Sequence, residues 1–183
     1  MSGKSPAGPL IHEHKVIERM ISSLGGTLSK LEETRSIDPV YIDTVVDFIR
    51  TYADRCHHGK EEDILFRDLA NKPLSGPVAA MMQELIEDHV FARGKTRELI
   101  SANARYASGD PRALDEISSV AWVLVDFYPK HIWKEDRQFW KPALEYFSED
   151  EQAAMVAEFE EVDRQLIHEK YLGVVERLEH WRT

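Results

Sequence analysis

The side chains best suited to chemistry in this 183-residue chain form an internal repeat of histidine and glutamate. Each copy has a lone histidine, then a second histidine 43 positions later in the first copy and 42 in the second, with a glutamate four residues after it. The six residues are His14, His57, Glu61, His89, His131 and Glu135. Two similar copies that face each other would place four imidazoles and two carboxylates at one level, a donor set typical of a metal site.

The spacing of four suits a helix, because positions i and i+4 lie on one face about one turn apart. His57 with Glu61, and His131 with Glu135, can therefore each present a nitrogen and an oxygen inward. Imidazole and carboxylate together suit iron, with manganese and zinc as alternative occupants. Two buried glutamates without a cation would be costly, and a carboxylate can bridge two ions. The repeat therefore predicts a centre that holds two metal ions.

Helices must position these residues, and clusters of proline, glycine and capping residues mark where the helices begin. Apolar residues recur every three or four positions between the clusters, which predicts four long amphipathic helices. Their expected ranges are 9–34, 38–70, 74–107 and 111–144. Asp38-Pro39 and Asp110-Pro111 each supply an N-cap oxygen and a preset φ for a first turn. Short connections between long helices favour an all-α, up-down-up-down four-helix bundle.

A spacing near 34 residues also fits tetratricopeptide units. Each such unit needs a helix break in its middle, and the candidate, Pro129, is interpreted as a kink in the fourth helix. Ser148 and Glu151 fit a capping box that opens a further helical region. The expected parts are a flexible N-terminus (1–8), a four-helix bundle (9–146) and a C-terminal helical extension packed on the bundle (147–183).

Composition excludes several classes of function. The 23 Lys and Arg residues stand against 33 Asp and Glu residues, and the net charge of −10 opposes binding to nucleic acid. Cys56 is the single cysteine, so no intrachain disulfide can form and nothing indicates an oxidising compartment. No apolar run approaches the roughly 18 residues of a membrane span, and the first nine residues lack the apolar segment of a signal peptide. We expect a cytoplasmic protein without nucleic-acid or membrane partners.

The histidine–glutamate pairs also have a recognisable sequence context. Residues 57–66, HHGKEEDILF, resemble the HxxxEExxLF signature of the HHE branch of the hemerythrin family, and residues 131–136, HIWKED, are similar to its second copy. The resemblance covers residues 10–144 and implies a hemerythrin-like bundle with two non-haem iron ions. It further implies that His14 and His57 hold one iron, that His89 and His131 hold the other, and that Glu61 and Glu135 bridge them.

Two departures from the oxygen-carrying hemerythrins bear on function. Those carriers have a fifth histidine one turn before the third-helix ligand, where this chain has Leu85. They also use an aspartate five residues after the fourth-helix histidine; Asp136 occupies that place, but Glu135 is the better match to the HHE branch. Two histidines per metal would leave coordination positions free, which a site for a small gas or peroxide requires.

The resemblance and its departures together predict a protein that binds or senses oxygen, nitric oxide or peroxide, or handles iron. An enzyme that turns over peroxide or reduces oxygen or nitric oxide would use the same site and remains an alternative. Both functions are compatible with a protein partner or an electron donor. A ferritin-type oxidase is disfavoured because its helices carry Glu-x-x-His pairs, which the predicted helices lack.

Two further histidines adjoin the repeat and are expected to face outward. His12 lies about 200° around the helix from His14, on the side of polar residues. His58 has Asp54 and Arg50 one and two turns before it, whereas His57 follows apolar residues at the same spacing. We therefore expect His57 to face the core and His12 and His58 to face solvent.

Overall fold

The computed structural model describes residues 5–163 and 167–181, and this part of the chain contains helices and no strand. The first long helix is α1 (Ala7–Thr34). The second runs through α2 (Pro39–Phe48), η1 (Ile49–His58), η2 (Glu61–Phe66) and α3 (Arg67–Leu69). The third is α4 (Gly76–Ala107), and the fourth runs through α5 (Ala113–Lys134), η3 (Glu135–Phe139) and α6 (Trp140–Leu144). Two shorter helices follow, α7 (Glu149–Asp163) and α8 (Ile167–Glu179).

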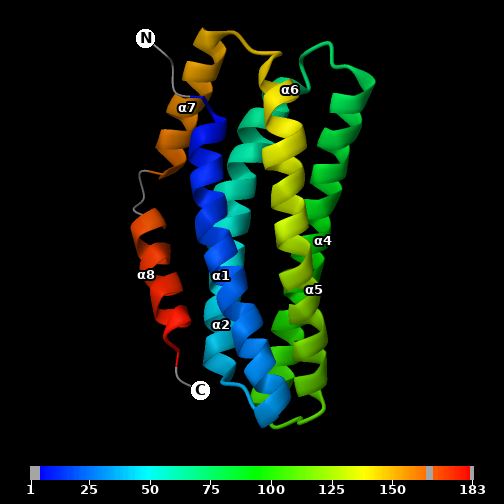
Figure 1. The fold of residues 1–183 in the computed structure, drawn as a ribbon, viewed down its shortest axis with the longest axis vertical. Coiled ribbons are helices and arrows are strands. Elements are labelled where there is room, and N and C mark those ends of the chain that lie inside the picture. Colours follow the sequence, from blue (N-terminus) through cyan, green and yellow to red (C-terminus); the bar gives the residue numbers. More distant parts are fainter. Residues whose placement is uncertain (1–4, 164–166, 182–183) are drawn as a thin grey trace.

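The four long helices pack as an up-down-up-down bundle (Figure 1), with α4 against α5 and α2, and α1 against α5. The predicted all-α bundle is therefore confirmed. The fourth helix continues through Pro129 without ending, unlike a tetratricopeptide pair. Of the N-terminus expected to be flexible, residues 1–4 lie outside the described part, and α1 begins at Ala7 instead of residue 9.

Local capping fixes where helices begin. The Asp38 carboxylate accepts a hydrogen bond from the Val40 amide at 2.9 Å, and Pro39 occupies the first turn of α2. The capping box at the start of α7 is also formed, because the Ser148 amide donates to the Glu151 carboxylate and the Glu151 amide donates to the Ser148 hydroxyl. The sequence signals and the hydrogen bonds thus agree at these two helix starts.

The second and fourth long helices are not α-helical throughout. Segments η1, η2 and η3 are π-helical, and they carry His57, Glu61 and Glu135. A π-helix forms i→i+5 hydrogen bonds and has more residues per turn than an α-helix, so successive side chains are separated by a smaller angle. Short π-helical turns are frequent at functional sites. The face on which a residue lies in these segments therefore differs from the α-helical expectation.

Two apolar clusters fill the bundle. The first contains residues such as Leu24, Tyr41 and Leu124, and the second contains residues such as Leu65 and Phe139. The buried histidines and glutamates of the repeat belong to neither cluster and form a separate polar layer of the core. Burial of the apolar side chains in these two clusters stabilises the bundle, so the layer of histidines and glutamates does not have to be apolar.

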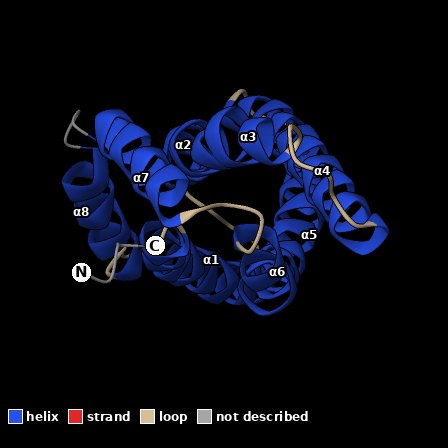
Figure 2. Ribbon diagram, turned by 90° about the horizontal axis from the view of Figure 1, so that it is seen from above, coloured by secondary structure: helices blue, strands red, loops and turns tan. Residues whose placement is uncertain are grey.

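The C-terminal helices lie along the outside of the bundle beside α1 and the second long helix (Figure 2). Helix α7 contacts η2, and α8 contacts α1 and α2. Phe159 of α7 and Tyr171 of α8 are fully buried, and the Tyr171 hydroxyl donates to the Asp47 carboxylate at 2.9 Å. No helix in the described residues is long and apolar enough to cross a membrane.

Packing of α7 on the bundle predicts a difference between two substitutions in the same helix. Phe159→Ala removes a ring that is 0% exposed and should lower the free energy of unfolding by about 3 to 5 kcal/mol. Val162→Ala is the control, because this side chain is 38% exposed and its truncation should cost less than about 0.5 kcal/mol. Urea denaturation measures both, and equal stabilities would show that α7 does not pack on the bundle.

Candidate metal centre

The structure brings all six residues of the repeat together at one level of the bundle. They come from α1, η1, η2, α4, α5 and η3, so each of the four long helices contributes. Each is at most 2% exposed. The spatial convergence that the repeat predicts is therefore present, and the remaining question is whether the donor atoms converge too.

One half of the centre contains His14, His57, Glu61 and Glu135, whose candidate ligand atoms all lie within 4.8 Å of one another. The Nε2 atoms of His14 and His57 are 2.9 Å apart. Glu135 Oε2 is 3.1 Å from His14 Nε2, and Glu61 Oε1 is 3.3 Å from His57 Nε2. Two nitrogens and two oxygens thus surround one point.

The other half contains His58, His89 and His131, whose ring nitrogens also lie within 4.8 Å of one another. Glu61 directs its second oxygen here, with Oε2 at 3.3 Å from His89 Nε2. Glu135 does the same, with Oε1 at 3.3 Å from His131 Nε2. Each glutamate therefore offers one oxygen to each half, the arrangement in which a carboxylate can bridge two ions.

His58 does not face solvent, so its expected position was wrong. It is 1% exposed, and its ring stacks on that of His89 with centroids 3.9 Å apart and planes 11° apart. The expectation assumed an α-helix, whereas η1 is π-helical, and the smaller angle between neighbours lets both His57 and His58 face the core. The repeat carried a signal for this: the residue that corresponds to His58 in the second copy is Ile132, which is apolar and buried. His12 is exposed, as expected.

The four histidines of the repeat share a second feature, a carboxylate on the outer ring nitrogen. The Nδ1 atoms of the four lie between 2.6 and 3.1 Å from an acidic side chain. The pairs are His14 with Asp136, His57 with Glu13, His89 with Glu62 and His131 with Asp88. A carboxylate accepts from Nδ1–H, which assigns the proton to Nδ1 and leaves the Nε2 lone pair directed at the centre. This is how histidine ligands of metals are usually oriented.

These acidic partners follow the repeat but cross between helices. Glu13 precedes His14 in the chain yet bonds His57, and Asp88 precedes His89 yet bonds His131. Likewise Glu62 and Asp136 directly follow the two central glutamates and bond the lone histidine of another helix. Sequence reasoning found the histidines but gave these four carboxylates no such role, because a partner on another helix is visible only once the helices are packed.

Two of these carboxylates also pair with a lysine. The Lys60 ammonium donates to Glu13 and the Lys134 ammonium donates to Asp88, again at corresponding positions of the repeat. Lys60 is 0% exposed and also pairs with Asp163 at the end of α7. Glu13, Cys56 and Asp163 lie close enough together to be considered for a cation, but the Lys60 ammonium already pairs with both carboxylates. Burial raises the pKa of the Cys56 thiol to about 12.

The electrostatic potential at the centre favours positive charge. Burial alone would lower the pKa of His14, but the hydrogen bond that its ring donates to Asp136 and the Glu135 carboxylate 3.1 Å away raise it to about 10. Burial would raise the pKa of Glu135, yet the neighbouring histidines hold it well below its usual range. His58 differs, because burial and the adjacent histidines lower its pKa and no carboxylate hydrogen bond offsets them. The Glu135 carboxylate thus stays ionised and attracts a cation.

Most of the buried nitrogen and oxygen atoms at the centre do not form hydrogen bonds with one another, and their placement suits a metal ion. Among the described residues, both carboxylate oxygens of Glu61 and of Glu135 and the Nε2 atoms of His89 and His131 form no hydrogen bond. Leaving such groups unsatisfied costs about 1 to 3 kcal/mol each, and more when they are charged. The Nε2 atoms of His14 and His57, 2.9 Å apart, need either a proton or a metal ion between them. A nitrogen and carboxylate set of this kind suits iron, manganese or zinc.

Comparison with known proteins agrees with this geometry. Neither the curated proteins nor the solved structures gave a match. A family model, that of the hemerythrin HHE cation-binding domain, matches residues 6–139. The match includes every residue of the repeat and its four carboxylate partners, from Glu13 to Asp136. The chain therefore belongs to the hemerythrin HHE cation-binding family.

Proposed function

We propose that this protein holds two non-haem iron ions at the centre and uses them to bind or sense a small oxidant or gas, namely oxygen, nitric oxide or peroxide, or to handle iron. Membership of the family supports cation binding. The observation that carries the two-ion assignment is the division of Glu61 and Glu135, each of which gives one oxygen to each half. Manganese and zinc are chemically acceptable substitutes.

The residues of the chain orient the ligands and exclude water. The carboxylates on Nδ1 hold the imidazole rings in place, and the apolar residues around the polar layer separate it from solvent. Bound iron would supply one-electron chemistry and attraction for a diatomic ligand or peroxide. The half with His14 and His57 has four candidate donors, whereas the other half has three histidines and the second oxygens of both glutamates, so the His14 half has more room for such a ligand.

The first test of the proposal is metal content together with ligand reactivity. Protein made in iron-rich medium should contain close to two iron ions per chain, because each half has its own donors and shares two bridging glutamates. One equivalent of nitric oxide per centre should change the optical spectrum of the protein. Removal of the gas should restore the original spectrum. Iron content near zero in folded protein would contradict the metal assignment. Consumption of peroxide or nitric oxide far beyond stoichiometry would favour the enzyme alternative over binding or sensing.

A second test compares two buried histidines with an exposed one. His57→Ala and His58→Ala each remove a buried imidazole from one half of the centre and should each lower the iron content measured by metal analysis. His12→Ala is the matched control, since this side chain is exposed and should leave iron content and melting temperature unchanged. Retention of full iron by the His58 variant would show that His58 is only a buried neighbour of the metals.

A third test addresses the carboxylates that orient the rings. Asp136→Asn keeps an oxygen near His14 Nδ1 but removes the charge, and should weaken iron binding about 10- to 100-fold in a chelator competition. Asp63→Asn on η2 is the control, because Asp63 is exposed and contacts no histidine of the centre. Equal affinities in the two variants would mean that the acidic partners do not support the metal ligands.

A further inference from the structure

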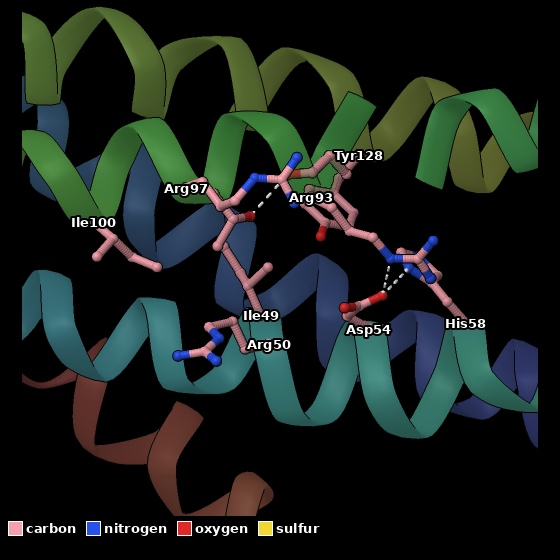
Figure 3. A pocket seen from close by; sticks show the side chains of 10 residues that line it. Ile49, Arg50, Asp54, His58, Arg93, Arg97, Ile100 and Tyr128 are labelled. Atoms are coloured by element: carbon pink, nitrogen blue, oxygen red, sulfur yellow. Dashed lines mark hydrogen bonds and ion pairs between the residues drawn. The ribbon is translucent and has the colours of Figure 1, made fainter. Parts of the chain in front are cut away.

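A pocket opens between η1 and α4 and reaches inward to the centre (Figure 3). Its volume is about 380 Å³, which lies within the usual range for small-molecule sites and far exceeds the roughly 30 Å³ of a water molecule. Apolar wall comes from Ile49, Ala92 and Ile100. The pocket is therefore larger and more apolar than a diatomic gas or peroxide requires.

Two buried polar groups at the inner end of this pocket have no partner. The Tyr128 hydroxyl belongs to a side chain that is 1% exposed, and among the described residues it forms no hydrogen bond. The same is true of His58 Nδ1, since Asp54 Oδ1 lies 3.5 Å away without hydrogen-bond geometry. Both residues line the pocket. A buried hydroxyl without a partner is costly, so these groups indicate a ligand with hydrogen-bonding atoms.

Three arginines give the pocket a positive character within a chain of net charge −10. Arg93 is neutralised, because its guanidinium pairs with Asp54 at 2.7 Å and with Glu62 at 2.8 Å. Arg50 comes from η1 and Arg97 from the facing α4 (Figure 3), both side chains are exposed, and in the described part of the chain neither forms an ion pair. Two uncompensated guanidinium groups attract an anion and offer nothing to a neutral gas.

We propose that this pocket binds a small organic carboxylate, with Arg50 and Arg97 as its charge partners, Tyr128 as a buried hydrogen-bond donor and the apolar wall around its carbon skeleton. Arginine suits this role because its guanidinium can bind a carboxylate through two parallel hydrogen bonds. Such a ligand would lie against His58 and so beside the second half of the centre. Arg50, Arg97 and Tyr128 are not among the candidate metal ligands, so variants of these residues test the pocket separately from the metal centre.

The test uses benzoate as the probe and benzamide as its uncharged analogue of nearly equal shape. Calorimetric titration of the purified full chain should show saturable benzoate binding that weakens as salt is raised, and benzamide should bind at least about tenfold more weakly. Arg50→Gln combined with Arg97→Gln should lower benzoate affinity about tenfold. Tyr128→Phe, which keeps the ring, should lower it about three- to tenfold. Arg112→Gln is the control and should change nothing, since this exposed arginine lies away from the pocket.

Measuring the iron content of the same samples distinguishes benzoate binding in the pocket from benzoate binding to the metal. Benzoate binding that depends on Arg50, Arg97 and Tyr128 supports the pocket, whether or not iron is present. Absence of benzoate binding, equal binding of benzamide, or benzoate affinity unchanged in the double arginine variant would overturn it. Unchanged affinity in the arginine variant together with benzoate binding only to iron-loaded protein would place the anion on the metal instead.

Discussion

The structure depends on the burial of two carboxylates in the middle of a helical bundle. Glu61 and Glu135 are 0% exposed, and neither has a hydrogen-bond donor of its own among the described residues. Taking ionised carboxylates out of water costs several kcal/mol each unless a cation compensates for the loss. The imidazoles around them converge on the same points, so a cation bound there would be held by nitrogens and would compensate the carboxylates. The polar layer is thus a cation site in which charge and geometry agree, and the apolar clusters of the bundle enclose it.

The outer carboxylates explain how rings on four helices reach one point. Each acidic side chain that orients a histidine comes from a different helix than the ring it holds, so helix pairs are joined at the level of the centre. Lys60 extends this network to Asp163, so three successive contacts connect the end of α7 to His57: Asp163 with Lys60, Lys60 with Glu13, and Glu13 with His57. The C-terminal extension is therefore linked to the centre by charge as well as by apolar packing.

Sequence patterns were sufficient to predict the structure where it follows from interactions between residues close together in the chain. Capping residues and apolar periodicity located the long helices, and the six residues of the repeat do meet in space. They were insufficient where the helix departs from the α-helical period. An angle of 100° per residue predicts that His57 faces the core and His58 faces solvent, whereas the π-helical segment brings both side chains inward. Glu13 and Asp88 illustrate a second limit, because each bonds a ring 43 or 44 positions away, and no local rule relates such residues.

His58 also breaks the symmetry that the repeat imposes on everything else in the layer. Its counterpart Ile132 is apolar, so one half of the centre gains an imidazole that the other lacks. Leu85, which replaces a histidine one turn before His89, is buried in an apolar cluster, and the additional imidazole reaches the same half from a different helix. In the proposed centre the two ions would therefore differ in ligand number although they share both glutamates. An ion with fewer protein ligands keeps more room for an external one, so in the proposed centre an external ligand would bind in the His14 half, and the His58 half would anchor the pair of ions.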